Sequence, residues 1–342
     1  MLMVRPGEAL DERTVADLPD LLRAGDVLVV NDTRVIPARL SGVRRRDEGE
    51  VRVEATLHRR LAPDRWSAFA RPGKRLRAGD RVSFGAADGV TCGLEATVAD
   101  KGEGGEVTLA FDLASAALDQ AVALHGLMPL PPYIAAKRGE DERDRADYQT
   151  VYAAHDGSVA APTAGLHFTP ELLDRLRHKG ITVAAVRLDV GLGTFRPIRT
   201  EDVDAHEMHA EAFEVPEETA RAVNACRGRV VAVGTTTLRA LESAALEAEN
   251  GTAAGRVCAA RGETRLFIRP AGGGHPGHRF RAVDALITNF HQPHSTLLLL
   301  VAAFAGRTTS ASAGPEHLRR AYATALAEGY RFLSFGDAML LH

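Results

Sequence analysis

Residues 27–40, VLVVNDTRVIPARL, carry the strongest indication of the fold class. The first four residues form a short, continuous apolar run, which predicts a strand that is buried on both faces. Polar side chains follow at once in NDTR (31–34), and Pro37 comes soon after them. The stretch therefore resembles the first strand of an α/β sheet, with polar residues gathered at its carboxyl end.

The residues that come next have a different pattern. Between residues 51 and 113, short alternating segments are separated by Gly, Asp and Pro, as in a small antiparallel barrel or sandwich. GLMPLPPYI (126–134) ends this β-rich region, because three prolines and a glycine resist regular structure. The charge-dense segment 135–149 is then typical of a solvated linker.

After residue 150 the pattern alternates between strands and helices. Thr169 can cap a helix that has Pro170 at its first position and Gly180 beyond its end. A second helix follows Ser295. The predicted strands are ITVAAVRL (181–188), RVVAVG (229–234) and DALIT (284–288), and RFLSFG (331–336) closes the chain. Such alternation predicts an α/β sheet with parallel members.

The order of these regions predicts an insertion. The strand at 27–30 belongs with the α/β pattern, yet the β-rich region lies between it and the rest of that pattern. We therefore predict a discontinuous α/β catalytic domain, residues 1–45 plus 135–342, and an inserted antiparallel β-barrel domain, residues 46–134.

Composition excludes several classes of protein. The 342 residues carry a net charge of −3, which rules out a uniformly basic nucleic-acid binder but leaves room for a local basic patch. The three cysteines, Cys92, Cys226 and Cys258, are widely spaced and form neither a disulfide framework nor a zinc ribbon pattern. The first residues lack an apolar signal core, and TLLLLVAAFAG (296–306) is too short to span a bilayer. The expected location is the cytoplasm.

Four predicted strand ends carry unusual polar residues. In an open α/β sheet, ligands bind beyond the carboxyl ends of the strands. If these ends face one way, they form a single crevice. The residues in question are Asn31, Asp32, Thr33 and Arg34; Asp189, Gly191, Gly193, Thr194 and Phe195; Thr235, Thr236 and Thr237; and Asn289, His291 and His294.

Each of these loops also has a simpler explanation. Asn31 and Asp32 fit an ordinary turn. The glycines of GLGTF (191–195) lack the third glycine and the downstream acid of a dinucleotide-binding fingerprint, so we reject that function. Thr235 to Thr237 fit a helix cap, whose N-terminus can also receive an anion such as a carboxylate. His167, in APTAGLHF (161–168), and His291 are candidates for chemistry because both lie in loops that carry Gly or Pro.

HEMHAE (206–211) resembles a zinc motif without matching it. The zincin pattern needs His-Glu-x-x-His, whereas His206 and His209 are one residue closer together. A bent loop that joined these two with Glu211 would be needed to hold a metal. We favour ligand orientation or RNA contact for this segment and predict no metal site.

Two basic segments lie near the β-rich region, at 43–52 and at 71–77. These segments are consistent either with an ordinary surface of mixed charge or with a surface that binds a polyanion electrostatically.

Long motifs in the chain's order indicate its family. They are VVNDTRVIPARL, MPLPPYI, DYQTVYA, GSVAAPTAGLHFT, VGLGTFRPI, HEMHAE, VAVGTTTLRALES, VDALITNFHQPHSTLLLLVAAFAG and YRFLSFGDAML. Together they resemble the S-adenosylmethionine:tRNA ribosyltransferase-isomerases of queuosine biosynthesis over nearly the whole chain. The resemblance implies an α/β domain with a smaller β-barrel domain.

The resemblance also implies a reaction. The ribosyl group of S-adenosylmethionine passes to the aminomethyl group of a 7-deazaguanine at the tRNA wobble position, and epoxyqueuosine-tRNA, adenine and methionine result. No metal or redox cofactor is required beyond the substrate S-adenosylmethionine. A base must remove a proton next to the sulfonium, and the candidates, which the sequence does not rank, are Asp32, His167, His209 and His291.

The methionine carboxylate needs a cation or a helix N-terminus, for which Arg34, Arg239 and the turn at Thr235 are candidates. The wall of the pocket for S-adenosylmethionine and the nucleobase is expected to run from Pro162 to His167. The remaining expected substrate contacts in and beyond this wall are Thr163, Ala164, Gly165 and Phe290.

Three departures from the family pattern keep other functions open. Asp189 stands where the family has His, His294 stands where it tends to have Lys, and an N-terminal stretch common in the family has no counterpart before Met1. One alternative is a diverged S-adenosylmethionine-dependent relative that acts on a small-molecule acceptor or catalyses another elimination or rearrangement. Another is a non-catalytic tRNA-binding protein on the same scaffold.

Overall fold

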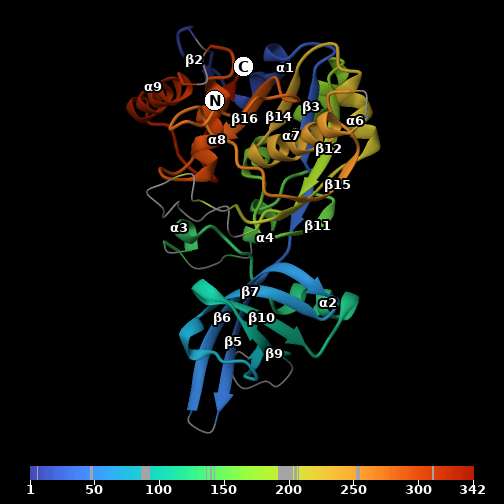
Figure 1. Ribbon diagram of the computed structural model, residues 1–342, viewed down its shortest axis with the longest axis vertical. Helices are drawn as coiled ribbons and strands as arrows, with labels where there is room; N and C mark the ends of the chain where they lie inside the picture. Colours follow the sequence, from blue (N-terminus) through green and yellow to red (C-terminus); the bar gives the residue numbers. More distant parts are fainter. Residues whose placement is uncertain are drawn as a thin grey trace. The chain divides into compact units, whose positions relative to one another are not determined.

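The structure is a computed structural model that describes residues 1–5, 7–46, 49–85, 93–135, 137–138, 141, 143–191, 203, 206, 208–251, 255–309 and 312–342. The chain forms two compact units (Figure 1). We call the first the α/β unit; it comprises Met1–Arg34, Gln149–His155 and Ala161–His342. We call the second the barrel unit; it comprises Val35–Tyr148 and Asp156–Ala160.

A nine-stranded mixed sheet forms the centre of the α/β unit. Its middle consists of four parallel neighbours, in the order β12 (Thr182–Leu188), β3 (Val27–Asn31), β14 (Val230–Val233) and β16 (Ala285–Asn289). β13 (Glu211–Val215) and β15 (Ala260–Thr264) extend the sheet beyond β12. β17 (Ala338–Leu341), β1 (Leu2–Val4) and β2 (Asp11–Glu12) extend it beyond β16.

β3 is central because its sequence is apolar on both faces. All five of its residues are buried, as expected for a strand between two covered faces of a parallel sheet. Val27 pairs with Thr182 on one side and with Val230 on the other. The prediction of a buried strand at 27–30 is confirmed.

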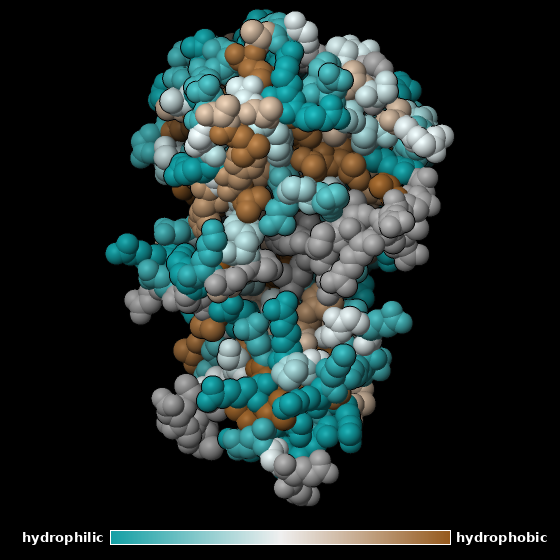
Figure 2. Space-filling model, turned by 90° about the vertical axis from the view of Figure 1, so that its left-hand side faces the viewer, coloured by the Kyte–Doolittle hydropathy of each residue, from teal (hydrophilic) through white to brown (hydrophobic). Residues whose placement is uncertain are grey.

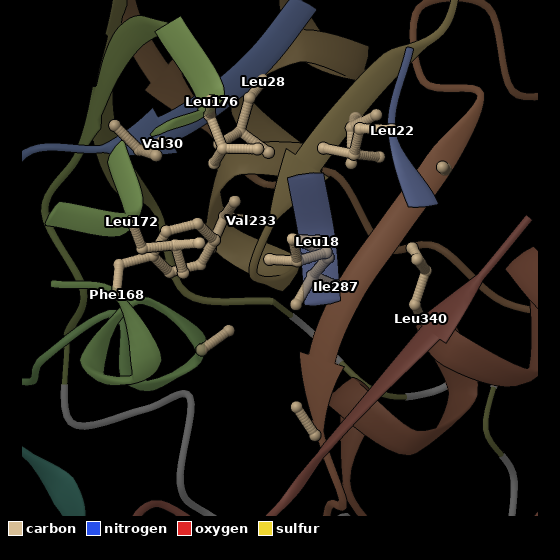
Figure 3. Close-up of a cluster of buried hydrophobic side chains, with 14 of the residues drawn as sticks. Leu18, Leu22, Leu28, Val30, Phe168, Leu172, Leu176, Val233, Ile287 and Leu340 are labelled. Atoms are coloured by element: carbon tan, nitrogen blue, oxygen red, sulfur yellow. The ribbon is translucent and has the colours of Figure 1, made fainter. Parts of the chain in front are cut away.

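Helices cover the sheet. α1 (Leu18–Leu21) and α5 (Pro170–His178) pack on one face, where their leucines meet Leu28 and Val30 of β3 and Val233 and Ile287 of the neighbouring strands (Figure 3). α6 (Glu217–Asn224) and α7 (Thr235–Asn250) pack against β12 from the other face. α8 (Thr296–Ala305) and α9 (Gly314–Ala327) pack on each other.

Helix caps lie where the sequence predicts them. The Thr169 hydroxyl accepts a hydrogen bond from the Leu172 amide at 3.2 Å, and Pro170 is the first residue of α5. Gly180 follows that helix with a φ of +82°, a conformation that glycine adopts without strain. Ser295 caps α8 in the same way, accepting from the Leu298 amide at 3.1 Å.

The barrel unit contains a closed antiparallel barrel with the strand order β10-β7-β6-β5-β8-β9. Its strands are β5 (Arg39–Arg46), β6 (Gly49–Ala62), β7 (Arg65–Arg71), β8 (Arg81–Phe84), β9 (Leu94–Lys101) and β10 (Glu106–Phe111). Alternate residues face inward, as the burial of Val107, Leu109 and Phe111 along β10 illustrates. The described outer face is mostly hydrophilic in the view of Figure 2. The α/β fold class with an inserted antiparallel barrel is therefore confirmed.

The barrel begins earlier than residue 46, where the sequence placed its boundary. β5 pairs with β6 along its whole length and also with β8, so Arg39–Arg46 is a barrel strand. Its buried positions are Leu40 and Arg44, and the burial of an arginine hides the alternation that would have revealed the strand. The unit also continues past residue 134 to Tyr148.

Short elements complete the description. In the barrel unit they are η2 (Gly73–Arg75), η3 (Glu103–Gly105), α2 (Ser115–His125), α3 (Pro132–Ala135) and α4 (Asp144–Asp147). In the α/β unit they are η1 (Val15–Asp17) and η4 (Thr163–His167). β4 (Thr33–Val35) pairs with β11 (His155–Ser158), and each of these two strands has residues in both units. Within the described ranges, no helix combines the length and the apolar character that crossing a membrane requires.

Candidate functional site

The carboxyl ends of the four parallel strands meet at one edge of the sheet. β3 ends at Asn31, β12 at Leu188, β14 at Val233 and β16 at Asn289. In the sheet, β12 lies next to β3 on one side, and β16 lies next to β14 on the opposite side. The connection that follows β3 therefore runs in the opposite direction to the connection that follows β14. The point between β3 and β14 is therefore a topological switch point, where open α/β sheets bind their ligands.

Asn31 joins three of these segments. Its amide nitrogen donates to the Leu188 carbonyl at 2.9 Å and to the Thr236 hydroxyl at 3.3 Å. Its amide oxygen accepts from the Leu188 amide at 3.0 Å. The side chain is fully buried, so a polar residue at the end of an apolar strand is explained by these bonds. The predicted convergence of the Asn31, Asp189 and Thr235 segments is confirmed.

Asp189 lies beside Asn31 in a charged cluster. Its carboxylate accepts two hydrogen bonds from the Arg187 guanidinium, at 2.9 and 2.8 Å, and one from the Thr33 hydroxyl at 3.0 Å. The pairing also raises the pKa of Arg187. The acid that stands where the resemblance expects a histidine is thus balanced by a cation two residues earlier.

Asp32 forms a pair with His155. His155 Nδ1 lies 3.1 Å from Asp32 Oδ2, and the backbone amides of Ala154 and His155 both donate to the Asp32 carbonyl. Burial raises the pKa of the Asp32 carboxyl, while the nearby His155 lowers it in part. A carboxyl with a raised pKa at a strand end is a candidate for proton transfer.

The N-terminus of α7 faces the same edge. Its cap residue, Gly234, has a φ of +90°, and among the described residues no side chain caps the first turn. The Thr237 hydroxyl instead donates back to the Val233 carbonyl at 2.7 Å. Thr235 to Thr237 therefore open the helix rather than cap it, and the first amides of a long helix favour an anion there.

The stretch APTAGLHF forms a short 3-10 helix, η4, where the sequence suggested a loop. Gly165 permits a close approach, because a Cβ there would lie 1.9 Å from the Tyr152 hydroxyl. The Thr163 hydroxyl donates to Asn289 Oδ1 at 2.8 Å and ties η4 to the end of β16. Ala164 is buried in the core cluster of the sheet, and Pro162 precedes the helix as its cap residue.

Three polar atoms around η4 are buried without a hydrogen-bond partner within the described part of the chain. They are Asn289 Nδ2, the Tyr152 hydroxyl and His167 Nε2. Buried polar atoms are nearly always paired, so such atoms need a partner from outside the chain or from water. Burial also raises the pKa of Tyr152, which keeps its hydroxyl proton in place.

His167 is the last residue of η4. The charged groups that influence its pKa are Asp337, the Met1 amino group and Arg331. Burial lowers the pKa of His167, which favours the neutral ring that a base requires. Among the described residues, His167 forms no hydrogen bond with Asp32 or with His291.

His291 is held by structural contacts. Its Nε2 lies 2.8 Å from the Thr288 hydroxyl, and its backbone amide donates to the Tyr322 hydroxyl at 2.7 Å. Burial lowers its pKa to about 4. The preceding Phe290 is fully buried against Tyr322 and Tyr330, so its observed role is packing and its contact with substrate stays a prediction.

The two candidate cations already have partners. Arg239 forms a buried ion pair with Glu211, which also accepts from the Gly191 amide at 3.1 Å. The charge of Arg239 is therefore balanced, although its Nη2 has no partner among the described residues. Arg34 is exposed and donates to the Ala153 carbonyl at 2.8 Å.

The segment that resembles a zinc motif does not gather ligands. Glu211 is paired with Arg239, His209 is exposed, and His206 packs edge-on against Phe267. In the part of the chain that is described, no three His, Cys, Asp or Glu side chains cluster as metal ligands would.

Four of the predicted site residues either form no hydrogen bond with the sheet edge among the described residues or are themselves outside the described residues. Gly193, Thr194 and Phe195 fall outside the described residues. His294 is exposed in the turn before α8, with a φ of +56°.

The sequence did not predict the contacts of Tyr152, His155, Arg187 and Glu211, although Glu211 had been weighed as a metal ligand. Tyr152 lies within DYQTVYA, a stretch that had already been singled out for its family resemblance. Nothing in the spacing of the other three pointed to their contacts.

Comparisons with known proteins show the family of the chain. Residues 1–341 match the family described as queuosine biosynthesis protein. A Phenylobacterium zucineum protein named S-adenosylmethionine:tRNA ribosyltransferase-isomerase is 60% identical over 100% of this chain and 92% of its own length. A Mesorhizobium japonicum protein of the same name is 57% identical over 100% of this chain and 91% of its own length. The crystal structure of S-adenosylmethionine tRNA ribosyltransferase from Thermotoga maritima is 32% identical over 100% of this chain and 91% of that chain, with a TM-score of 0.48.

Proposed function

The chain belongs to the queuosine biosynthesis protein family, and from this premise we propose that it is an S-adenosylmethionine:tRNA ribosyltransferase-isomerase. It transfers the ribosyl group of S-adenosylmethionine to tRNA and isomerises it. The acceptor is the 7-aminomethyl-7-deazaguanine at the wobble position. The products are epoxyqueuosine-tRNA, adenine and methionine.

The position of Asn31 is the observation that carries this proposal. It links the end of β3 to the end of β12 and to the first turn of α7 across the switch point of the sheet. A nucleoside substrate needs such a place, where backbone and small polar groups from several strands approach one ligand. The family motifs around Asn31, Asp189 and Thr235 come together here.

The helix N-terminus is the proposed site for the methionine carboxylate. The first amides of α7 have no side-chain cap from the described residues, whereas the charge of Arg239 is already balanced by Glu211. An uncapped helix start attracts an anion through its dipole and its free amides. Arg239 then supports the site, and its Nη2 remains available as a donor.

Asp32 and His167 are the proposed candidates for the base. The sulfonium acidifies the neighbouring C5′ hydrogen, so removal of that proton starts the loss of adenine. Burial raises the pKa of Asp32 and brings it closer to neutrality, which strengthens this carboxylate as a base. Burial lowers the pKa of His167, which keeps its ring neutral and able to accept a proton. His291, with a pKa of about 4 and its Nε2 next to Thr288, is a weaker base, and His209 is exposed.

The chemistry as proposed needs no metal or redox cofactor. The sulfonium of S-adenosylmethionine is itself the activated group, and adenine and methionine are the leaving groups. The acceptor amine must be neutral to attack, which a partly desolvated pocket favours. A cytoplasmic location, expected from the sequence, fits a tRNA substrate.

Adenine release is the direct test. Purified protein is incubated with S-adenosylmethionine and either precursor-bearing tRNA, tRNA that carries guanine at the wobble position, or no tRNA. Adenine that appears only with the precursor-bearing tRNA supports the proposal. Release without tRNA would indicate a different acceptor, and absence of release under all three conditions would exclude the enzyme function.

A further inference from the structure

A cluster of cations that have no acidic partner among the described residues lies on the barrel unit, which does not contain the sheet edge described above. We call residues 71–77, RPGKRLR, the basic loop; it joins β7 to β8. It holds Arg71, Lys74, Arg75 and Arg77 and contains no acidic residue. Because the whole chain has a net charge of −3, this loop is a local concentration of positive charge.

The basic loop has a fixed backbone. Its middle is the 3-10 turn η2, in which the Arg75 amide donates to the Pro72 carbonyl at 3.0 Å and the Leu76 amide to the Gly73 carbonyl at 3.2 Å. The Leu76 side chain is 1% exposed and anchors the loop in the barrel core. Gly73 packs on the backbone of Gly105, where an added Cβ would lie 2.9 Å from the Gly105 Cα.

Asp80, the first acid after the basic loop in the sequence, is already committed to another cation. Asp80 accepts from the backbone amide of Arg77 at 2.8 Å and binds the Arg46 guanidinium through both oxygens, at 2.7 and 2.6 Å. Its carboxylate is almost fully buried. Asp80 therefore holds the end of the basic loop while its charge is balanced by Arg46.

The four cations of the basic loop are exposed and lack an acidic partner among the described residues. Other cations on the same barrel are paired: Arg45 with Glu50, Arg60 with Asp119 and Arg81 with Asp112. The difference matters because a paired cation must give up its partner before it binds a phosphate, whereas an unpaired one only releases counterions.

Two further cations reinforce the charge of the loop. Lys101 donates through Nζ to the Leu76 carbonyl at 3.1 Å, and the buried Arg44 donates to the Arg75 carbonyl at 3.3 Å. The carbonyl groups of the loop thus face cations from neighbouring strands. The cations are held on a fixed backbone, lack acidic partners among the described residues and have further cations beside them. Such a group is better suited to binding a polyanion than to forming part of a mixed-charge surface.

We propose that the basic loop is an RNA-docking surface, which binds backbone phosphates of the tRNA outside the nucleotide being modified. This inference rests on the proposed function, which supplies the tRNA. The bonds are to phosphate, so they position the RNA and do not read its sequence. The reacting nucleoside and S-adenosylmethionine bind without the help of this loop.

The test compares two triple variants that remove the same amount of charge. In the loop variant, Lys74→Ala, Arg75→Ala and Arg77→Ala remove unpaired cations. In the control variant, Arg45→Ala, Arg60→Ala and Arg81→Ala remove paired cations of the same barrel. Binding of an unmodified tRNA transcript to the full chain is measured by fluorescence anisotropy across a range of salt concentrations.

We expect the loop variant to bind at least about 10-fold more weakly at low salt. Its salt slope should fall by roughly 2 to 3, because each phosphate that is no longer neutralised lowers the slope by about one. The control variant should stay within about 3-fold of wild type, because its cations are already neutralised. In steady-state assays the loop variant should raise KM for precursor tRNA and leave KM for S-adenosylmethionine unchanged.

A loop variant with wild-type affinity and salt slope would overturn the proposal, as would an equal weakening in the control variant. The single variant Lys74→Glu covers the case in which the triple variant folds poorly, and its tRNA affinity must fall as well. Arg75→Lys with Arg77→Lys should keep most of the binding. Failure of the proposed function looks different: wild-type protein would bind tRNA through the loop and release no adenine.

Discussion

Arg239 and Glu211 form an ion pair inside the α/β unit, and each side chain is at most 4% exposed. Such a pair is costly to break because the remaining charge stays buried without its partner. We predict that Glu211→Ala lowers the free energy of unfolding by about 3–5 kcal/mol. Urea denaturation measures the change.

The matched variant replaces both partners, Arg239→Met with Glu211→Leu. It should be less destabilised than the sum of the two single variants, because no lone charge is left inside. Additive effects in this double-mutant cycle would show that the two side chains act independently. The same variants test the carboxylate site: if the α7 N-terminus binds methionine, the double variant keeps measurable affinity for S-adenosylmethionine.

Asp32→Asn should lower turnover far more than stability. The amide matches the carboxyl in size and can still accept a hydrogen bond from His155, but it cannot remove a proton. We expect kcat to fall by about 10²- to 10⁴-fold, the usual contribution of a general base. Because burial raises the pKa of Asp32, the ionised form is disfavoured in the fold, and the thermal midpoint should not fall. Equal losses of activity and stability would favour a purely structural Asp32.

His167→Phe separates chemistry from packing. The phenyl ring fills the space of the imidazole but supplies neither a base nor a partner for substrate at the position of Nε2, which has no partner in the described chain. We expect turnover to fall at least about 100-fold while the thermal midpoint changes little. Retained turnover in His167→Phe, together with reduced stability in His167→Ala, would assign the ring to the core.

Gly165→Ala should destabilise the α/β unit mainly through its contact with Tyr152, although Thr150 Cγ2 would also lie 2.9 Å from the new Cβ. The new methyl group would lie 1.9 Å from the Tyr152 hydroxyl, so the two cannot coexist without movement. Overpacking of this kind costs about 1–3 kcal/mol. Adding Tyr152→Phe removes the hydroxyl and should restore part of that stability. If Tyr152→Phe restores nothing, another neighbour of Gly165 is responsible.

His291 gives the protein a pH-dependent stability. Burial lowers its pKa to about 4, whereas an unfolded chain takes up a proton near pH 6.5. The unfolded state therefore binds more protons between these values, and stability rises with pH. The contribution of the neutral ring is complete above about pH 6.5 and declines toward pH 4.

His291→Gln lacks this titration, so the difference between its urea midpoints at pH 7.5 and pH 5 should be smaller than in wild type. His209→Gln, at an exposed position, is the control and should keep the wild-type difference. An unchanged pH dependence in His291→Gln would show that the ring is accessible to protons in the folded protein.

Local signals in the sequence predicted the parts of the fold that depend on local physics. The apolar run before Asn31 marks a central strand, and Thr169 with Pro170 marks a helix start. Neither needs information from elsewhere in the chain. β5 was missed because Arg44, a residue typical of surfaces, is buried in it.

The site was predictable in outline and not in detail. The direction of parallel strands places Asn31 and Asp189 at one edge, which the pattern of elements already implies. The partners that set their charge are another matter. These pairings depend on where the side chains lie in the folded protein, and spacing along the chain does not encode them. They are Arg187 with Asp189, His155 with Asp32 and Glu211 with Arg239.

The central place of β3 has a consequence for synthesis. Val27 needs Thr182 and Val230 as its neighbours, and both leave the ribosome long after it. At roughly 5–20 residues per second, the wait is on the order of ten seconds or more. During this time the barrel can close through its own antiparallel pairs, while a bare apolar strand is exposed to chaperones and to other nascent chains. A chain truncated before residue 182 would be released with neither of the strands that pair with Val27.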